Sequence, residues 1–102
     1  QKTPEIIMAK APEDKYYTNV MLAQSADLLL TLKGIECSFA IGYLEEGKVG
    51  ISARSLGNIN VQLIMEELGG GGHLANAATQ IEGVNLDEAL DRLNDAIDKI
   101  LS

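Results

Sequence analysis

Four consecutive glycines occupy residues 69–72 and are directly followed by His73, the single histidine of the chain. Because glycine has no Cβ atom, the backbone of such a run can approach a ligand closely and adopt conformations that other residues avoid. Successive N–H groups of such a backbone form an anion-binding concavity, and a histidine ring can donate to phosphate oxygens. We therefore interpret Gly70, Gly71, Gly72 and His73 as a phosphate cradle. The alternative is that the glycines only end a helix and form a flexible turn.

The glycine run differs from the two common phosphate-binding motifs. A P-loop requires Lys followed by Ser or Thr after its glycines, and this pair is missing from GGGGHL. The dinucleotide-binding fingerprint connects a strand to a helix, whereas this run follows a predicted helix. Phosphate binding here would therefore belong to neither motif.

A second candidate site is the segment SARS at residues 52–55. Arginine presents a planar fork of donors that matches phosphate geometry, and the chain has two arginines. Arg92 stands among the acidic residues of the last predicted helix, where a surface pair with a carboxylate one turn away is expected. Arg54 has no such local partner, so we predict that Arg54 binds phosphate, whereas Ser52 and Ser55 alone would be unremarkable surface hydroxyls. The alternative for Arg54 is a solvated charge at the end of a strand.

The other side chains offer little for catalysis or metal binding. Cys37, the one cysteine, lies on the apolar face of a predicted strand and is expected to be a buried small side chain. One Cys and one His exclude an internal disulfide, a cysteine-rich zinc site and a multi-histidine centre. The adjacent pairs Glu45-Glu46 and Glu66-Glu67 are interpreted as solvated charges. We therefore predict a binder of phosphate without catalytic residues or metal ligands of its own.

The elements that position these residues follow from hydrophobic periodicity, prolines and glycines. The expected order is strand 5–11, helix 16–33, strand 35–44, a turn at 45–48, a strand from residue 49, helix 58–68, a weaker strand 76–82 and a helix from 86 to about 101. In the second strand of the hairpin, alternation places Ser52 and Arg54 on the face opposite Ile51 and Ala53. The first helix is apolar on more than one face, which predicts that it is covered on two sides.

The composition is that of one ordinary globular domain. The chain has 102 residues, of which 46% are hydrophobic and 23% charged, and its element order predicts a single α/β domain with a mixed sheet packed with about three helices. The formal net charge of −7 argues against a broad nucleic-acid surface, which would need clustered Lys and Arg. No apolar stretch approaches the ~20 residues of a membrane span. We expect a cytoplasmic domain, and a first residue of Gln1 suggests a fragment of a larger protein.

The run ISARSLGNINVQLIMEELGGGGHLANAATQIEG, residues 51–83, resembles the C-terminal DHH-associated (DHHA) domain of the Asp-His-His phosphodiesterase superfamily. Its combination of SARS and GGGGH is most similar to the branch of membrane-anchored cyclic di-AMP phosphodiesterases. The broader superfamily more often has GGGH, two residues and then Ala-Ala-Gly. Here three residues, Leu74-Ala75-Asn76, precede the alanine pair, which differs from the nuclease members. The resemblance covers essentially the whole chain, residues 1–102.

The resemblance implies that this chain is the substrate-binding domain of a larger enzyme that opens cyclic di-AMP to linear pApA. Such an enzyme binds Mn²⁺ in an adjacent Asp-His-His (DHH) domain, so the fragment would hold no metal and be inactive alone. Its partners would be a cyclic dinucleotide or short oligonucleotide, the DHH domain of the same chain and, as an open possibility, a second copy. The parent protein would lie at the cell membrane, without direct membrane contact by this part. Substrate binding would fall to Ser52, Arg54, the backbone of the glycines from Gly70 to Gly72, and His73.

Two other functions are compatible with the sequence. An RNA- or tRNA-binding module is one, because alanyl-tRNA synthetases carry a related C-terminal domain. The acidic net charge and the few aromatic residues weigh against it, since phosphate neutralisation and base stacking are both poorly supplied. A structural dimerisation domain is the other, suggested by the strongly apolar first helix. Salt-dependent RNA binding would indicate the former, and concentration-dependent dimerisation without nucleotide binding the latter.

Overall fold

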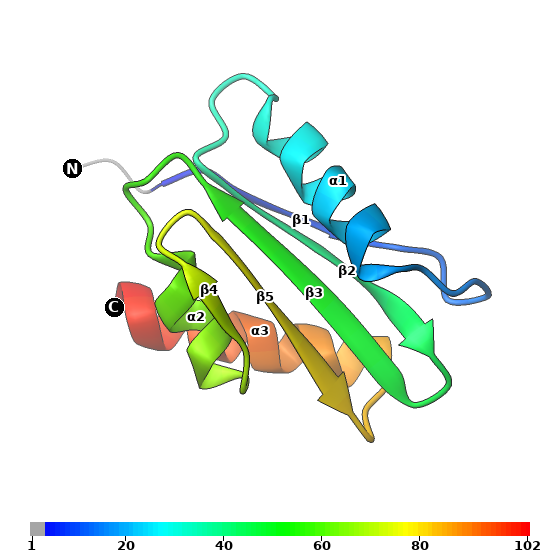
Figure 1. The fold of residues 1–102 in the computed structure, drawn as a ribbon. Helices are drawn as coiled ribbons and strands as arrows, with labels where there is room; N and C mark the ends of the chain where they lie inside the picture. Colours follow the sequence, from blue (N-terminus) through cyan, green and yellow to red (C-terminus); the bar gives the residue numbers. More distant parts are fainter. Residues whose placement is uncertain (1–3) are drawn as a thin grey trace.

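Residues 4–102 are described by a computed structural model, in which five strands and three helices form an α/β fold (Figure 1). The elements are, in chain order, β1 (Ile6–Lys10), α1 (Asn19–Leu30), β2 (Cys37–Glu45), β3 (Lys48–Ser55), α2 (Val61–Glu67), β4 (Gly71–His73), β5 (Asn76–Glu82) and α3 (Leu86–Leu101). The strands form one sheet in the order β1-β2-β3-β5-β4. β1 and β2 are parallel and the other neighbours antiparallel. The predicted α/β domain with a mixed sheet and three helices is confirmed.

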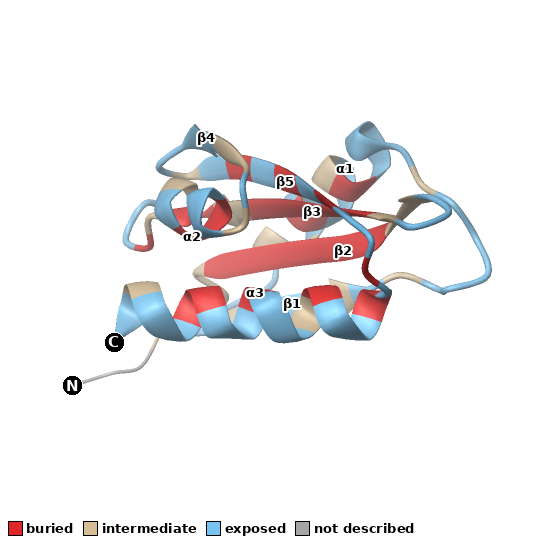
Figure 2. Cartoon of the chain, turned by 90° about the horizontal axis from the view of Figure 1, so that it is seen from below, coloured by how far each residue is buried: buried red, intermediate tan, exposed pale blue. Residues whose placement is uncertain are grey.

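The two faces of the sheet are packed differently, because successive side chains of β2 and β3 point to opposite faces. One face of β3 directs Val49, Ile51 and Ala53 into the main core, which they share with side chains of α2 and α3. The other face lies against α1, so that a Cβ atom at Gly50 would be 3.0 Å from Leu22 Cδ1. Helices α1 and α3 therefore cover opposite faces of the sheet, as Figure 2 shows. The predicted face for Ser52 and Arg54 is the one that α1 partly covers.

Helix α1 is shorter than predicted at both ends. It begins after Thr18, whose side chain accepts a hydrogen bond of 3.1 Å from the Met21 N–H, whereas the sequence pattern predicted a start at residue 16. Leu22 and Ala26 are its buried residues, and Val20 and Leu28 are 64% and 70% exposed. The expectation that this helix is covered on two sides is therefore wrong within residues 4–102.

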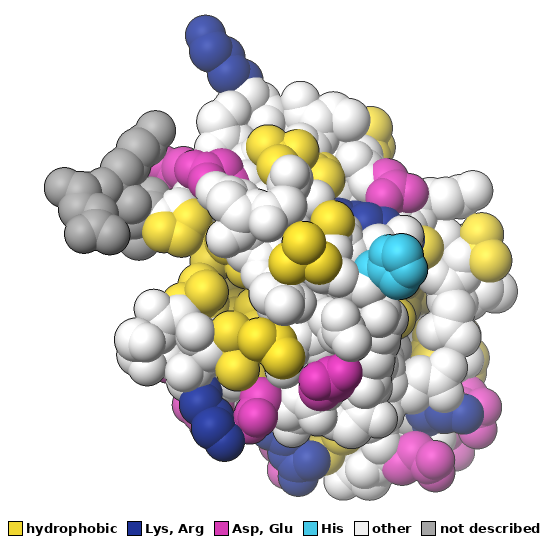
Figure 3. All heavy atoms as spheres, turned by 60° about the vertical axis from the view of Figure 1, so that its left-hand side comes forward, with side chains coloured by type: hydrophobic (Ala, Val, Ile, Leu, Met, Phe, Trp, Pro, Cys, Tyr) yellow, Lys and Arg dark blue, Asp and Glu magenta, His cyan; other side chains and the backbone are white. Residues whose placement is uncertain are grey.

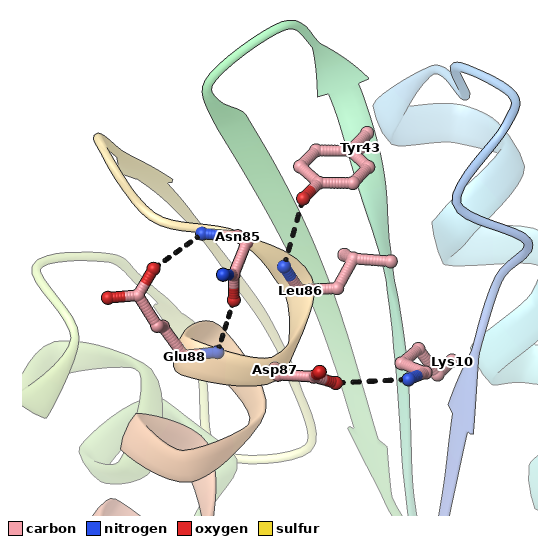
Figure 4. Close-up of polar contacts among 6 residues, drawn as sticks. All are labelled: Lys10, Tyr43, Asn85, Leu86, Asp87 and Glu88. Atoms are coloured by element: carbon pink, nitrogen blue, oxygen red, sulfur yellow. Dashed lines mark hydrogen bonds and ion pairs between the residues drawn. The ribbon is translucent and has the colours of Figure 1, made fainter.

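Helices α2 and α3 both begin at an asparagine cap. Asn60 accepts from the Leu63 N–H at the start of α2. At the start of α3, Asn85 and Glu88 form a capping box with hydrogen bonds of 2.8 and 3.1 Å (Figure 4). The hydroxyl of Tyr43 on β2 also accepts from the Leu86 N–H at 3.2 Å. The Tyr43 contact attaches the first turn of α3 to the sheet. The helix then packs its predicted apolar stripe onto the core.

Candidate functional site

The glycine run first serves to end α2. Gly69 has a φ of +84°, a left-handed conformation that glycine adopts without steric penalty. Its N–H donates to the Glu66 carbonyl at 3.1 Å, and the Gly70 N–H donates to the Met65 carbonyl at 2.8 Å. This pair of bonds is a Schellman motif, which satisfies carbonyls that a helix end leaves free. Part of the glycine run is therefore required by the local fold.

The next residues, Gly71–His73, form the edge strand β4, and the alternative interpretation of a flexible turn is wrong at these residues. They pair with β5 in the order Gly71↔Ala78, Gly72↔Ala77 and His73↔Asn76. Glycine is a poor strand former, so the pairing with β5 and not local propensity determines the conformation. An edge strand keeps one row of backbone N–H and C=O groups unpaired. The backbone of β4 can thus still offer donors to a ligand from its outer edge.

Each of the glycines in the predicted cradle meets different surroundings. A Cβ atom at Gly70 would lie 2.2 Å from the Ala78 carbonyl oxygen, and one at Gly72 would lie 2.6 Å from Ala77 Cα. Gly72 also has a φ of +145°. Gly71 has neither restriction, since a Cβ atom there would meet no atom of residues 4–102 within 4 Å and its φ is ordinary. The fold therefore explains Gly70 and Gly72, whereas Gly71 leaves open space above the strand.

The register of the sheet brings four of the predicted site residues together. The pairs Ser38↔Arg54, Arg54↔Asn76 and Asn76↔His73 form one continuous row across β2, β3, β5 and β4. We call this row the arginine row. Directly paired residues have their side chains on the same face of the sheet, and the next row on that face is two residues further along each strand. This second row, the serine row, runs Ala40, Ser52, Ala78, Gly71. Predicted Ser52, Arg54, Gly71 and His73 are thus neighbours on one face, whereas Gly70 and Gly72 lie outside both rows.

The half of this face formed by β5 and β4 is open to solvent. Helix α1 contacts β2 and β3, and the residues of β5 that share its side of the sheet, Asn76, Ala78 and Gln80, are exposed. His73 is exposed as well, and Figure 3 shows it on the surface with basic and acidic side chains close by. Gly71 and Ala78 have small side chains or none, so the surface there is not obstructed by side chains of the serine row. The two rows therefore lead from the edge of α1 onto an accessible surface.

Arg54 is held by contacts that its sequence neighbours do not supply. Its Nε donates to Asp27 Oδ1 of α1 at 2.6 Å, and its Nη1 donates to the Ala53 carbonyl at 2.9 Å. The Arg54 side chain is 12% exposed and that of Asp27 is 62% exposed. The alternative of a solvated charge at a strand end is therefore wrong. Arg54 is a fixed, largely buried cation next to an open surface.

The two serines that flank this arginine differ in their partners. Ser38 donates to the carbonyl of Ala26 in α1 at 2.7 Å. Ser52 is 4% exposed, yet its hydroxyl makes no side-chain hydrogen bond within residues 4–102 and is not sealed from solvent. Ser52 is therefore able to donate to an acceptor arriving at the serine row.

The same part of the chain holds no candidate catalytic or metal site. No group of three or more His, Cys, Asp or Glu side chains within residues 4–102 could hold a metal ion, so these residues do not fit a Mn²⁺ centre. Cys37 is fully buried in the core, as predicted, and burial raises the pKa of its thiol to about 12. A thiol with this pKa remains protonated near neutrality and is a poor nucleophile.

Two residues of the site were not predicted. Asp27 could not be found locally because it lies 27 positions before Arg54. Asn76 could have been found from spacing, since a two-residue turn at Leu74 and Ala75 pairs His73 with Asn76. That step required recognising the glycine segment as a strand.

With this geometry established, comparison with known proteins identifies the family. A family model described as "DHHA1 domain" matches residues 4–102. The chain belongs to the DHHA1 domain family. This confirms the resemblance that the SARS and GGGGH segments suggested.

Relatives of this DHHA1 chain include two named cyclic di-AMP phosphodiesterases. It is 53% identical over 96 residues to "Cyclic-di-AMP phosphodiesterase GdpP" of Bacillus subtilis (strain 168), covering 92% of this chain and 15% of that protein. It is 52% identical over 91 residues to "Cyclic-di-AMP phosphodiesterase PdeA" of Listeria monocytogenes, covering 89% of this chain and 14% of that protein. The chain therefore spans about one seventh of the length of these relatives.

A solved structure shows the same fold at low identity. The C-Ala domain of alanyl-tRNA synthetase from Aquifex aeolicus superimposes with a TM-score of 0.64 at 16% identity, covering 90% of this chain and 87% of that domain. At this identity the likeness concerns the fold alone. No helix within residues 4–102 has the length and apolarity needed to span a bilayer.

Proposed function

We propose that this DHHA1 domain, residues 1–102, is the substrate-binding part of a longer phosphodiesterase that opens cyclic di-AMP to linear pApA. The relatives named above support the substrate class. The reaction would require metal ions held by a separate Asp-His-His domain, because the residues described here do not form such a centre. The parent enzyme would be anchored at the membrane, with this domain on the cytoplasmic side.

The observation that carries the proposal is the meeting of Arg54, Ser52, Gly71 and His73 in two adjacent rows on an open face. In the proposed complex a phosphate contacts the Arg54 guanidinium, which is held in place and has donors to spare, and the Ser52 hydroxyl, whose donor has no protein partner within residues 4–102. Gly71 leaves room for that phosphate. The His73 ring then packs against or donates to the neighbouring nucleotide.

We propose further that Asn76 contacts the adenine base of the bound nucleotide. It stands between Arg54 and His73 in the arginine row and is exposed. A side-chain amide offers a donor and an acceptor side by side, a pattern that can pair with the N6 and N7 edge of adenine. Asn76 is thus placed to favour an adenine nucleotide.

The direct test is an NMR titration of the ¹⁵N-labelled chain with pApA. We expect shifts of the backbone amides of Gly71, His73 and Asn76 that saturate at roughly millimolar ligand, an affinity of about −4 kcal/mol. Unchanged amides in β4 and β5 at this concentration would rule out the proposed site.

The matched variants are Arg54→Ala and Arg92→Ala, which remove the same charge from different places. Arg92 lies on α3, across the sheet from the site, and is exposed. Loss of a charge-assisted phosphate contact weakens binding by roughly 10- to 100-fold, which we expect for Arg54→Ala alone. Equal effects of the two variants would show that net charge and not the site determines binding.

A further inference from the structure

We infer that Asp27 of α1 is a positioning residue for substrate, because it holds the Arg54 guanidinium ready for a phosphate. This inference rests on the proposed function and names a second residue on which that site depends. It follows from which donors of Arg54 are bonded to the protein and from how the Asp27 carboxylate is held beside them.

The arginine uses part of its donor set on the protein. A guanidinium has five N–H donors, and two of them are engaged, Nε by Asp27 Oδ1 and one of the two at Nη1 by the Ala53 carbonyl. Three donors, including both at Nη2, have no partner within residues 4–102. These are the donors nearest the tip of the side chain. Asp27 therefore fixes the base of the fork and leaves its tip free.

The carboxylate is itself placed by a buried contact. The carbonyl of Ala26, next to Asp27, accepts the hydrogen bond of 2.7 Å from Ser38, whose own sheet partner is Arg54. Ser38 and Ala26 are fully buried. This contact fixes the position of α1 on the sheet next to the arginine row. Asp27 is thereby held beside Arg54 even though its own side chain is largely exposed.

Holding the arginine reduces the entropy lost on binding. A free arginine side chain has many rotamers and loses much entropy when it is fixed, and each side chain that a ligand must immobilise weakens the complex. An arginine fixed by Asp27 and Ala53 has already lost most of this freedom. We therefore expect removal of the carboxylate to weaken phosphate binding.

The negative charge of Asp27 predicts the opposite effect on phosphate binding. The direction of the change in affinity therefore distinguishes positioning from repulsion. A carboxylate this close to a phosphate site repels the phosphate, and its removal would strengthen binding if repulsion were its main effect. Positioning predicts that Asp27→Ala weakens pApA binding roughly three- to tenfold. Asp27→Glu, which can again accept from Nε, should recover part of the loss.

The experiment compares Asp27→Ala, Asp27→Glu and Asp95→Asn in the pApA titration. Asp95 is an exposed acid of α3 without an ion pair within residues 4–102, so its variant changes net charge by the same unit at a distance. The signal of the Arg54 Nε–H reports positioning directly. It should exchange slowly with solvent in the wild type and rapidly in Asp27→Ala. Thermal melting checks that each variant is folded.

The double variant Asp27→Ala with Arg54→Ala separates the two proposals. If Asp27 acts through Arg54, the double variant binds no more weakly than Arg54→Ala alone. Unchanged or tighter binding by Asp27→Ala, with Arg54→Ala still weakened, would overturn the role of Asp27 and leave the site intact. If Arg54→Ala has no effect, the proposed function fails as well.

Discussion

The fourfold glycine run shows how residues of one type can have different reasons for being there. Gly69 and Gly70 end α2 through the Schellman bonds, and Gly72 combines a positive φ with close contact to Ala77. Gly71 has no such constraint within the fold. Its lack of a side chain matters only if something approaches from outside. Three of the four consecutive glycines thus have a structural reason, and the fourth, Gly71, is the one for which we propose a binding role.

The substitutions Gly72→Ala and Gly71→Ala should therefore have opposite signatures. We expect Gly72→Ala to lower the free energy of unfolding by roughly 2–4 kcal/mol, from a strained φ and a clash with β5. Gly71→Ala should change it by less than about 0.5 kcal/mol and still weaken pApA binding. Urea denaturation and the NMR titration measure the two effects. A Gly71→Ala variant that binds normally would exclude close approach of the ligand at this residue.

At this residue scale, part of the site could be predicted and part could not. Arg54 and His73 were found because arginine and histidine are uncommon in this chain, and Ser52 because strand alternation places it on the same face as Arg54. Asp27 was missed because its contact with Arg54 depends on how α1 packs across the sheet. Contacts of this kind arise from tertiary packing and leave no spacing in the sequence.

Among the elements, α3 combines a local cap in its first turn with contacts to two strands of the sheet. The Tyr43 hydroxyl connects it to β2 and the ion pair of 3.1 Å between Lys10 and Asp87 connects it to β1, whereas its capping box lies within the turn itself. The box was predictable because Asn followed three residues later by Glu is a local pattern. By contrast, β4 was not predictable from propensity, since its pairing with β5 overrides the preference of glycine.

Loss of the α3 cap should destabilise the whole fold. We expect Asn85→Ala to reduce the free energy of unfolding by about 1 kcal/mol, because it leaves the Glu88 N–H without an acceptor. Asn94→Ala, at an exposed position within α3, should be neutral or slightly stabilising because alanine is the better helix former. Urea denaturation of both variants gives the comparison. Equal effects would show that the cap contributes nothing beyond helix propensity.

For the whole molecule, the net charge of −7 and the fixed arginine have different ranges of action. The Arg54 contact acts over a hydrogen bond, whereas the acidic surface acts over roughly 8–10 Å at ordinary ionic strength. A dinucleotide can place its phosphate on Arg54 and keep most of its length away from the acidic surface. A long oligonucleotide cannot, because each further phosphate meets the field of the whole chain. The architecture therefore favours short ligands.

We accordingly expect the chain to bind pApA at least as tightly as an oligoadenylate of about ten nucleotides. The affinity for pApA should fall little between roughly 50 and 200 mM salt, because one phosphate contact releases few counterions. Isothermal titration at both salt concentrations, with the two ligands side by side, measures length preference and salt dependence together. Tighter binding of the longer strand with a steep loss at higher salt would instead indicate a nucleic-acid interface. That outcome would contradict the dinucleotide site and support the RNA-binding interpretation, since several basic contacts would then be required to produce the slope.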